Sequence, residues 1–293
     1  GKLVLTGAYA VLEGAPAIVI AVDRRARASE GPGEATAEVR AALENPPSVD
    51  VSELLHDGKK LGLGSSAAAL VAAIGLRAAL RGQDLRSDAI RRAIFARARE
   101  VHAEVQGGGS GVDVAASTFG GVLRYTMAGG AESVELPAGV RVAAFFSGES
   151  ARTSDLRARV DALRASDAAA RAACLAALAD TARAAEKALR AADAKKLIAA
   201  VDASGPALAA LGRAADAAIV PPAFAKLGDA ARAEGAAFVP SGAGGGDVGV
   251  FVGMTAPSAS FEKRAAQSGM RAVPIQIDRH GVRVETEQQE TIR

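Results

Sequence analysis

The sequence predicts an α+β fold in two halves, and three features of the chain carry this prediction. Short apolar runs rich in β-branched residues open the chain and are separated by Gly and Pro, as in strands joined by turns. Residues 154–211 are almost wholly helical in composition, and the remainder alternates between strand-like and helix-like segments. Strands therefore come first in one half and helices first in the other, with a boundary near residues 140–155.

Composition narrows the class of protein. A chain of 293 residues can bury a large core without staples. The 35 Lys and Arg residues nearly balance 33 Asp and Glu, and aromatic residues are only 3%, so neither a basic coat nor base-stacking rings for nucleic acid are present. One Cys excludes an internal disulfide framework and fits a reducing compartment. No apolar run approaches the roughly 20 residues of a membrane helix. We expect a cytoplasmic protein that binds neither nucleic acid nor membrane.

The first elements are predicted strands. Apolar runs at 3–5, 10–12 and 17–22 lie between turn residues, and residues 36–43 could extend the same sheet before the Pro-containing break at 44–47. The opening of the chain is therefore expected to be β.

Two helices are expected next. Residues 65–81 contain almost no helix breaker and end at Gly82, which is typical of a buried helix. A second helix is expected from about 87 to 105, because Ser87 can cap it and Asp88 favours its first turn. One apolar face of this helix would consist of Ile90, Ile94, Ala98, Val101 and Val105.

The rest of the chain continues the mixed pattern. After glycines at 107–111 we expect another helix start, then strands over 121–126 and 140–146. The long helical region of 154–211 is interrupted by Gly205-Pro206, and Gly212 follows it. Pro221-Pro222 begins a helix that Gly235 ends. The predicted elements beyond it are strands over 236–239 and 248–252 around a loop at 241–247, a helix over about 257–268, a strand over 271–277 and a possible strand over 281–286.

A glycine-rich loop at Gly62-Leu-Gly-Ser-Ser-Ala67 carries the clearest chemical signal. Gly62 and Gly64 let the backbone approach a ligand, Ser65 and Ser66 offer hydroxyls, and a helix begins at once. Free N–H groups and the positive end of the helix dipole would then face the loop, which suits a polyphosphate. The alternative is a tight helix start capped by serine.

Two known phosphate motifs do not describe this loop. A P-loop needs Gly-Lys-Ser/Thr, whereas Gly64 is followed by Ser65. Residues 62–67 fit the loose dinucleotide fingerprint, with Asp84 at a suitable distance. However, residues 55–60 do not read as a buried strand, and Asp84 follows a helix end.

Two further glycine loops stand at element junctions. In Gly107-Gly-Gly-Ser-Gly-Val-Asp113, the Asp113 carboxylate follows a loop that can approach a ligand, and it could accept a proton from an attacking hydroxyl. Capping of the next helix is its alternative role. The loop Ser241-Gly-Ala-Gly-Gly-Gly-Asp247 holds four glycines in seven residues, which suits close packing against its backbone, and a flexible hairpin is the alternative.

In this order, the loops resemble the three signatures of the GHMP kinase superfamily. The first signature is matched by residues 1–13, the second by 62–69 and the third by 235–247. The resemblance implies a two-domain GHMP kinase fold. Its N-terminal half, residues 1–145, would be ribosomal S5 domain 2-like and bind ATP, and its C-terminal half, residues 146–293, would be ferredoxin-like α+β.

Within the superfamily the match is closest to the phosphomevalonate kinases. Tyr9 stands where mevalonate kinases have His, and residues 109–116 and 147–153 also resemble this family. The implied reaction is ATP-dependent phosphorylation of 5-phosphomevalonate to the diphosphate. Mevalonate kinase, another GHMP small-molecule kinase and a catalytically silent nucleotide-binding relative remain alternatives. The protein is expected to act as a monomer or homodimer.

The resemblance also implies roles for individual residues. Asp113 and Lys2 would be catalytic, because a lysine beside the acceptor oxygen stabilises charge while the carboxylate orients or deprotonates it. ATP with Mg²⁺ is the implied cofactor, with the Ser66 hydroxyl near the metal. The implied ATP-binding residues are Gly62, Leu63, Gly64, Ser65, Ser66 and Ala67.

A phosphorylated acceptor requires cations in its site. Arg152 is the preferred candidate because it lies in the Ser-Ala-Arg-Thr stretch and arginine binds phosphate bidentately; Lys59, Lys60 and Arg124 are further candidates. The implied substrate-binding residues are Tyr9, Ser110, Gly111, Ser150, Arg152, Thr153, Ser241, Gly242, Gly244 and Gly245.

Three positions depart from the family pattern. Ala8 stands where many members have Glu, and Val239 where a Lys often precedes the third signature. His102 falls where mevalonate kinases place a Mg²⁺-binding Glu, although Glu100 or Glu104 could serve. A helix-surface or core imidazole is the alternative for His102. The protein ligand of the metal is therefore open.

Overall fold

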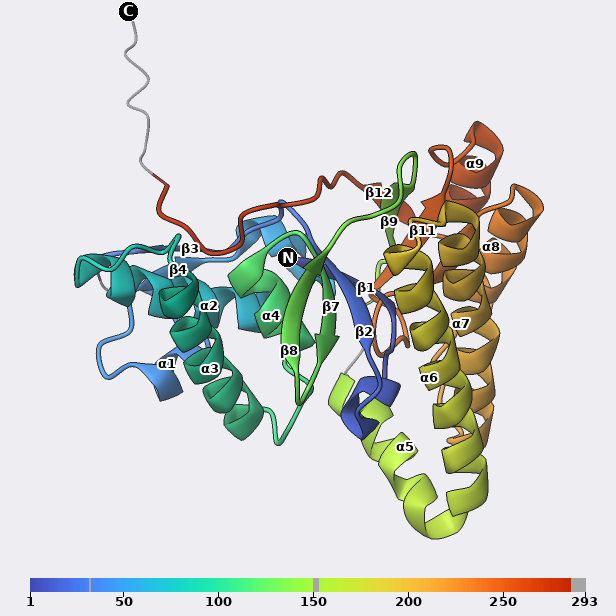
Figure 1. Ribbon diagram of the computed structural model, residues 1–293, viewed down its shortest axis with the longest axis horizontal. Helices are drawn as coiled ribbons and strands as arrows, with labels where there is room; N and C mark the ends of the chain where they lie inside the picture. Colours follow the sequence, from blue (N-terminus) through green and yellow to red (C-terminus); the bar gives the residue numbers. More distant parts are fainter. Residues whose placement is uncertain (32, 150–152, 286–293) are drawn as a thin grey trace, which may run out of the picture.

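The computed structural model describes residues 1–31, 33–149 and 153–285, and it contains two four-stranded antiparallel sheets with helices layered around them (Figure 1). The first sheet has the order β1-β2-β7-β8. Its strands are β1 (Lys2–Thr6), β2 (Ala17–Ala21), β7 (Val122–Thr126) and β8 (Gly130–Val134). The second sheet has the order β10-β11-β9-β12. Its strands are β9 (Arg141–Phe146), β10 (Ala237–Pro240), β11 (Val248–Gly253) and β12 (Arg271–Val273).

Alternating side chains of β1 face two different helical layers. Leu3 and Leu5 belong to a core cluster with residues of α6 (Ala168–Arg190) and α7 (Ala194–Ala214). Val4 packs in a different cluster with residues of α4 (Val112–Phe119). Because successive side chains of a strand point to opposite faces, Lys2 shares the α4 face with Val4. This alternation decides which side of the sheet receives the lysine.

The remaining helices of the first half cover the α4 side. They are α1 (Ala37–Ala42), α2 (Ser65–Leu80) and α3 (Asp88–Val105), which pack against one another, and α2 and α3 also pack against α4. The predicted helices over 65–81 and 87–105 are thereby confirmed. Ser87 does stand at the N-cap of α3, but its side chain makes no capping hydrogen bond.

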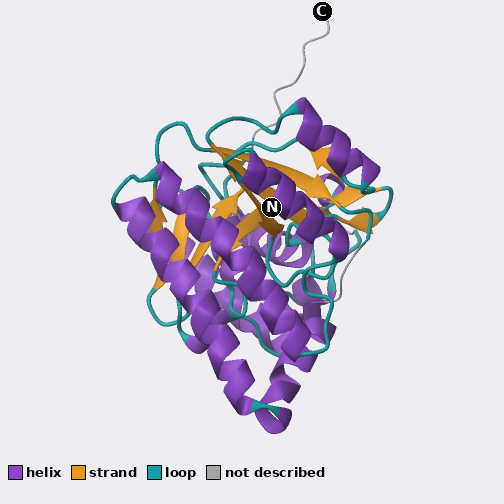
Figure 2. Ribbon diagram, turned by 90° about the vertical axis from the view of Figure 1, so that its right-hand side faces the viewer, coloured by secondary structure: helices purple, strands orange, loops and turns teal. Residues whose placement is uncertain are grey.

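The helices of the second half form a layer between the two sheets and another outside the second sheet. Helices α6 and α7 contact β1 on one side, and α7 contacts β10 on the other (Figure 1). Helices α8 (Pro222–Ala233) and α9 (Ala259–Gln267) bury phenylalanines against the outer face, and Figure 2 shows long helices in front of the strands when viewed from that side. Helix α5 (Thr153–Ser166) packs mainly on α6.

Short elements complete the described chain. They are the ribbons β3 (Arg27–Ser29) with β4 (Ser48–Asp50) and β5 (Leu55–His56) with β6 (Lys59–Lys60), and the 3₁₀ turns η1 (Ala10–Glu13) and η2 (Ser52–Leu54). The polar strand β8 and both ribbons were not predicted from the sequence, because they lack the apolar alternation of a half-buried strand.

Two predicted strands are wrong. Residues 10–12 form η1, since Tyr9 at φ 62° and Gly14 at φ 89° turn the backbone at both ends and leave too short a run to pair. Residues 37–42 form helix α1, because the Thr36 side chain caps the first turn by accepting from the Val39 N–H.

Three later predictions also need correction. Gly205-Pro206 does not interrupt α7, which runs through both residues while braced between α6 and β10. The strand predicted over 271–277 ends at Val273, and Ile277 instead forms an isolated bridge with Val22. Residues 281–285 form no strand, since Val282 enters the apolar cluster between α2 and α3. The other predicted elements of the second half are confirmed.

The sheets bear on the proposed division of the chain. The expected boundary at 145/146 falls inside β9, whose partners β11 and β12 both belong to the second sheet. Residues 274–285 return to the first half of the molecule.

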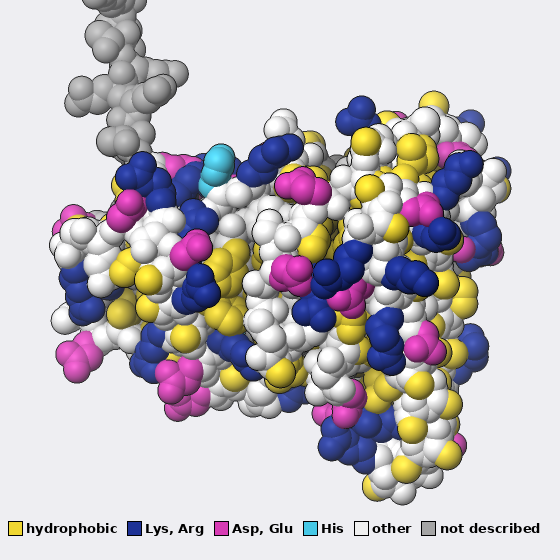
Figure 3. All heavy atoms as spheres, viewed as in Figure 1, with side chains coloured by type: hydrophobic (Ala, Val, Ile, Leu, Met, Phe, Trp, Pro, Cys, Tyr) yellow, Lys and Arg dark blue, Asp and Glu magenta, His cyan; other side chains and the backbone are white. Residues whose placement is uncertain are grey.

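On the face drawn in Figure 3, basic and acidic side chains are interspersed. None of the helices in the described ranges has the length and apolar character needed to cross a membrane.

Candidate active site

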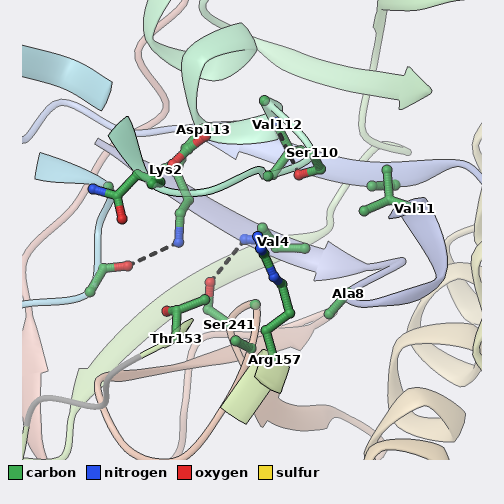
Figure 4. Close-up of a pocket in the computed structure, with 18 of the residues that line it drawn as sticks. Lys2, Val4, Ala8, Val11, Ser110, Val112, Asp113, Thr153, Arg157 and Ser241 are labelled. Carbon is green, nitrogen blue, oxygen red and sulfur yellow. Dashed lines mark hydrogen bonds between the residues drawn. The ribbon is translucent and has the colours of Figure 1, made fainter. Parts of the chain in front are cut away.

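A cavity of about 490 Å³ opens between the two halves of the molecule. All three glycine-rich loops contribute to its wall, together with β1 and the start of α5 (Figure 4). The structure therefore brings together residues as far apart in the sequence as Lys2 and Asp247.

The loop over Gly62–Ser66 forms one wall, with α2 beginning at Ser65. Gly62 and Gly64 have φ angles of +77° and +79°. A Cβ on Gly62 would lie 2.4 Å from the Asp247 Cβ, and one on Gly64 would lie 3.3 Å from both the Asp113 Cβ and the Lys2 Cγ. Only glycine fits at Gly62, because the loop is packed between the other two signatures.

The predicted nucleotide-binding residues divide into two groups. Gly62, Gly64, Ser65 and Ser66 line the cavity. Leu63 and Ala67 are buried in the core and do not line it. The amides at the start of α2 can donate hydrogen bonds to a bound anion, as helix N-termini do.

Lys2 reaches the cavity from β1. Its Nζ donates to the Gly62 carbonyl oxygen at 2.9 Å, as Figure 4 shows. Burial lowers the pKa of the Lys2 ammonium, while the nearby Asp113 and Asp247 carboxylates act in the opposite direction. Lys2 is thus a partly desolvated cation that adjoins both the loop over Gly62–Ser66 and Asp113.

Asp113 lies in the first turn of α4, and the His102 imidazole lies between it and Ser66. Its Oδ1 accepts from the Val114 N–H at 3.0 Å, and its Oδ2 lies 3.8 Å from His102 Nε2. The same Nε2 is 3.2 Å from Ser66 Oγ. His102 is therefore neither a surface residue nor isolated in the core, because it joins the first loop to Asp113.

The third loop is anchored to the first strand and turn. Ser241 Oγ accepts from the Val4 N–H at 2.9 Å, and the Tyr9 hydroxyl donates to the Ala243 carbonyl at 2.7 Å. Burial raises the pKa of the Tyr9 phenol, so it remains a donor. Gly242 and Gly244 line the cavity.

The remaining predicted substrate residues have mixed positions. Ser110, Gly111 and Thr153 line the cavity. Gly245 does not line it and donates its N–H to the Ile219 carbonyl. Ser150 and Arg152 lie outside the described residues.

Only some of the predicted cations and metal ligands lie at the cavity. Lys60 lines the cavity, whereas Lys59 donates to the Gly148 carbonyl. Arg124 does not line it and pairs with Glu186, with Nε and Oε1 3.0 Å apart. Glu100 and Glu104 do not line the cavity either. The described residues contain no cluster of three or more His, Cys, Asp or Glu suited to a metal ion.

Arg157 was missed by the sequence analysis. It lines the cavity from α5, one helical turn after Thr153 (Figure 4). Nothing in the sequence distinguishes it from the other arginines of this helix, because its position depends on how α5 packs near the Gly107–Gly109 loop.

Comparison with known proteins identifies part of the chain. The family model of the GHMP kinases N terminal domain matches residues 37–121, which include the loop over Gly62–Ser66, α2, α3 and Asp113. Over residues 37–121 the chain therefore matches a GHMP kinase N-terminal domain. The resemblance inferred from the three loops is confirmed.

GHMP kinases also appear among the relatives in sequence. The chain is 32% identical over 177 residues to a mevalonate kinase of Methanothermobacter thermautotrophicus, covering 52% of this chain and 57% of that protein. It is 45% identical over 78 residues to a phosphomevalonate kinase of Streptomyces sp. strain CL190, covering 26% of this chain and 20% of that protein. The chain thus spans little more than half the length of the first relative and a fifth of the second.

The fold matches that of solved GHMP kinases, as predicted. Streptococcus pneumoniae phosphomevalonate kinase in complex with phosphomevalonate and AMPPNP superposes with a TM-score of 0.78 at 20% identity, covering 94% of this chain and 98% of that one. At this level of identity the likeness concerns the fold.

Proposed function

We propose that the protein is an ATP-dependent phosphotransferase that converts 5-phosphomevalonate to its diphosphate. The observation that carries the proposal is the cavity in which Lys2 and Asp113 adjoin the loop Gly62–Ser66. Such an arrangement supplies what phosphoryl transfer needs, namely positioning of a triphosphate and stabilisation of charge beside the acceptor.

The chemistry assigns a role to each residue. Amides at the start of α2 hold the triphosphate, and an acceptor phosphate oxygen forms a bond to the γ-phosphorus as the bridging bond to the β-phosphate breaks, releasing ADP. The Lys2 ammonium stabilises the charge of the transferring group. When the acceptor phosphate carries a proton, Asp113 accepts it; this phosphate has a second pKa near 6, so it is largely ionised at neutral pH.

The donor set is compatible with Mg²⁺ bound largely through phosphates. The Ser66 hydroxyl and Asp113 carboxylate lie on either side of His102 and offer oxygen atoms, which this ion prefers. When bound, Mg²⁺ would neutralise charge on the β- and γ-phosphates. Few protein ligands are needed, because Mg²⁺ commonly keeps several waters.

Support for the acceptor comes from relatives. The chain is 45% identical to a phosphomevalonate kinase over 78 residues, and it shares its fold with a phosphomevalonate kinase bound to phosphomevalonate. A second candidate acceptor is mevalonate, favoured by the longer match to a mevalonate kinase. With that acceptor, Asp113 would have to deprotonate a hydroxyl.

Turnover of purified protein with ATP and Mg²⁺ tests the proposal. We expect ADP release with 5-phosphomevalonate to exceed that with mevalonate or a panel of sugars. Turnover of mevalonate alone would refute the acceptor. Nucleotide binding without transfer to any acceptor would instead indicate a silent relative.

The variant Asp113→Asn tests the role of the carboxylate. We expect kcat to fall about 10²-fold or more, because the carboxylate no longer orients the acceptor, while binding of a fluorescent ATP analogue stays within about threefold. Asp88→Asn, an exposed carboxylate in the first turn of α3, is the matched control. A variant that loses nucleotide affinity and retains kcat would contradict this role.

A further inference from the structure

Three lysine and arginine side chains line the cavity in the described part of the chain: Lys2, Lys60 and Arg157. Two of them belong to the wall formed by the first loop. Lys2 donates to the Gly62 carbonyl, and Lys60 precedes Gly62 by two residues. Arg157 enters from α5, a different wall (Figure 4).

Arg157 lies against the second glycine-rich loop. Its Nη2 donates to the Gly107 carbonyl at 2.5 Å, and a Cβ on Gly108 would lie 3.2 Å from that nitrogen. The Tyr125 hydroxyl donates to the Ser110 carbonyl and so fixes the next part of the same loop. The guanidinium is therefore positioned by the loop that leads to Asp113.

In the described residues, Arg157 pairs with Asp161 and donates one hydrogen bond to Gly107, so protein acceptors use only part of its donor capacity. Within the described residues its nearest carboxylate is that of Asp161, with Nε and Oδ2 3.8 Å apart, which is too long for a hydrogen bond. A guanidinium has five N–H donors, and Gly107 uses one of them. The side chain is 29% exposed, so it is only partly solvated.

Two hydroxyl side chains line the same cavity as this guanidinium. Thr153 precedes Arg157 by four residues and so shares its helix face, and both line the cavity with Ser110. A phosphate has three terminal oxygens that accept from several donors, whereas a carboxylate has two. The number of donors favours phosphate.

We propose that Arg157, with Thr153 and Ser110, binds the phosphate of a phosphorylated acceptor and thereby selects it over an unphosphorylated one. This inference rests on the proposed function and deepens it. The bound phosphate is also the nucleophile, so a bidentate arginine can hold two of its oxygens while the third attacks. An acceptor without this group would leave the partly desolvated guanidinium poorly paired.

The test compares wild type, Arg157→Gln and Arg157→Lys, with Arg159→Gln as control. Arg159 is on the same helix, is 57% exposed and pairs with Asp216 away from the cavity. We measure kcat/KM for 5-phosphomevalonate and for mevalonate, and calorimetric binding of 5-phosphomevalonate without nucleotide. Thermal unfolding verifies that each variant is folded.

We expect the ratio of kcat/KM for 5-phosphomevalonate over mevalonate to fall about 10²-fold in Arg157→Gln, because two charge-assisted hydrogen bonds are lost. Arg157→Lys should lose about tenfold, since it keeps the charge without the fork. Arg159→Gln should retain the wild-type ratio. Equal losses with both acceptors would mean that Arg157 binds the carboxylate they share, and an unchanged ratio would mean no acceptor contact; either result overturns the inference.

The binding measurement separates this inference from the proposed function. If the wild type binds 5-phosphomevalonate in an Arg157-dependent way but transfers no phosphate to it, the function fails and the inference stands. If the wild type transfers phosphate to it but affinity and ratio do not depend on Arg157, the function stands and the inference fails. If Arg157→Gln does not fold, the lysine variant gives the same comparison.

Discussion

At the scale of single residues, the site depends on glycines that let three signatures meet. Gly62 packs on Asp247, and Gly64 lies between Asp113 and Lys2. The left-handed φ angles at both positions would strain the backbone of any residue that carries a Cβ. Close packing and backbone conformation thus act together at the same two positions.

Gly62→Ala separates these two effects when compared with Gly82→Ala. Both glycines have φ near +77°, yet a Cβ on Gly82 would meet nothing within 4 Å. We expect each variant to lose about 1 kcal/mol of unfolding free energy from backbone strain. Only Gly62→Ala should in addition raise the KM for ATP, by about tenfold or more, because Asp247 must move.

Urea unfolding and steady-state kinetics measure the two effects. An ATP KM that rises equally in both variants would show that contact with Asp247 is unimportant. The serine-capped helix start considered from the sequence does not account for this packing.

At the scale of elements, helix starts that look alike in sequence differ in the structure. Ser258 caps α9 by accepting from the Phe261 N–H at 3.0 Å. Ser87 occupies the same position on α3 without a side-chain capping bond. Capping therefore depends on the rotamer that the local packing permits, and a serine before an apolar run does not guarantee it.

Ser258→Ala and Ser87→Ala test this difference. We expect Ser258→Ala to lower the free energy of unfolding by about 1 kcal/mol, because an orphan N–H loses its acceptor. Ser87→Ala should change it by less than about 0.5 kcal/mol. Equal losses in chemical denaturation would argue that Ser87 also caps its helix in solution.

At the scale of the whole molecule, the segment after β12 ties the second half back to the first. Its Ile277 bridges Val22, and its Asp278 pairs with Arg25 and Arg283 through contacts of 3.0 and 3.1 Å. Burial raises the pKa of Asp278, but hydrogen bonds from the His280 N–H and Arg283, with the attraction of both arginines, outweigh it and leave the pKa below its ordinary value. The carboxylate is only 7% exposed.

The lowered pKa of Asp278 predicts a pH dependence of stability. The folded state binds this proton more weakly than the unfolded state, so the contribution is present above the unfolded pKa of about 3.9 and is lost as pH falls through the folded pKa. We expect Asp278→Asn to lower the free energy of unfolding by about 2 kcal/mol at pH 7. Below pH 4 this free energy should then fall less steeply with decreasing pH than in the wild type.

Unfolding free energies at pH 7 and below pH 4 test this expectation. Asp229→Asn is the matched control, because Asp229 is 78% exposed and its pair with Arg232 should contribute little. If the free energy of unfolding falls as steeply with decreasing pH in Asp278→Asn as in the wild type, other carboxylates are responsible for the acid dependence.

Local sequence patterns were enough to predict the α+β class, most long elements and the three glycine-rich loops, which the structure places at the cavity. These features follow from local signals: apolar periodicity marks a buried face, and glycine marks a backbone that must turn or approach a ligand. Asp113 and the loop over Gly62–Ser66 could be named for the same reason, whereas Lys2 was named only from the family resemblance. Short elements were assigned less well, because residues 10–12 and 37–42 are too few for periodicity to separate strand from helix.

Which polar side chains share the cavity depends on long-range packing and could not be predicted from local patterns. Arg157 enters it and Arg124 does not, although both are arginines on regular elements. Likewise, His102 joins Ser66 to Asp113 because α2, α3 and α4 converge there. The physical reason is that local sequence fixes the face of a helix on which a side chain lies, while the packing of that helix against distant segments fixes what the face meets.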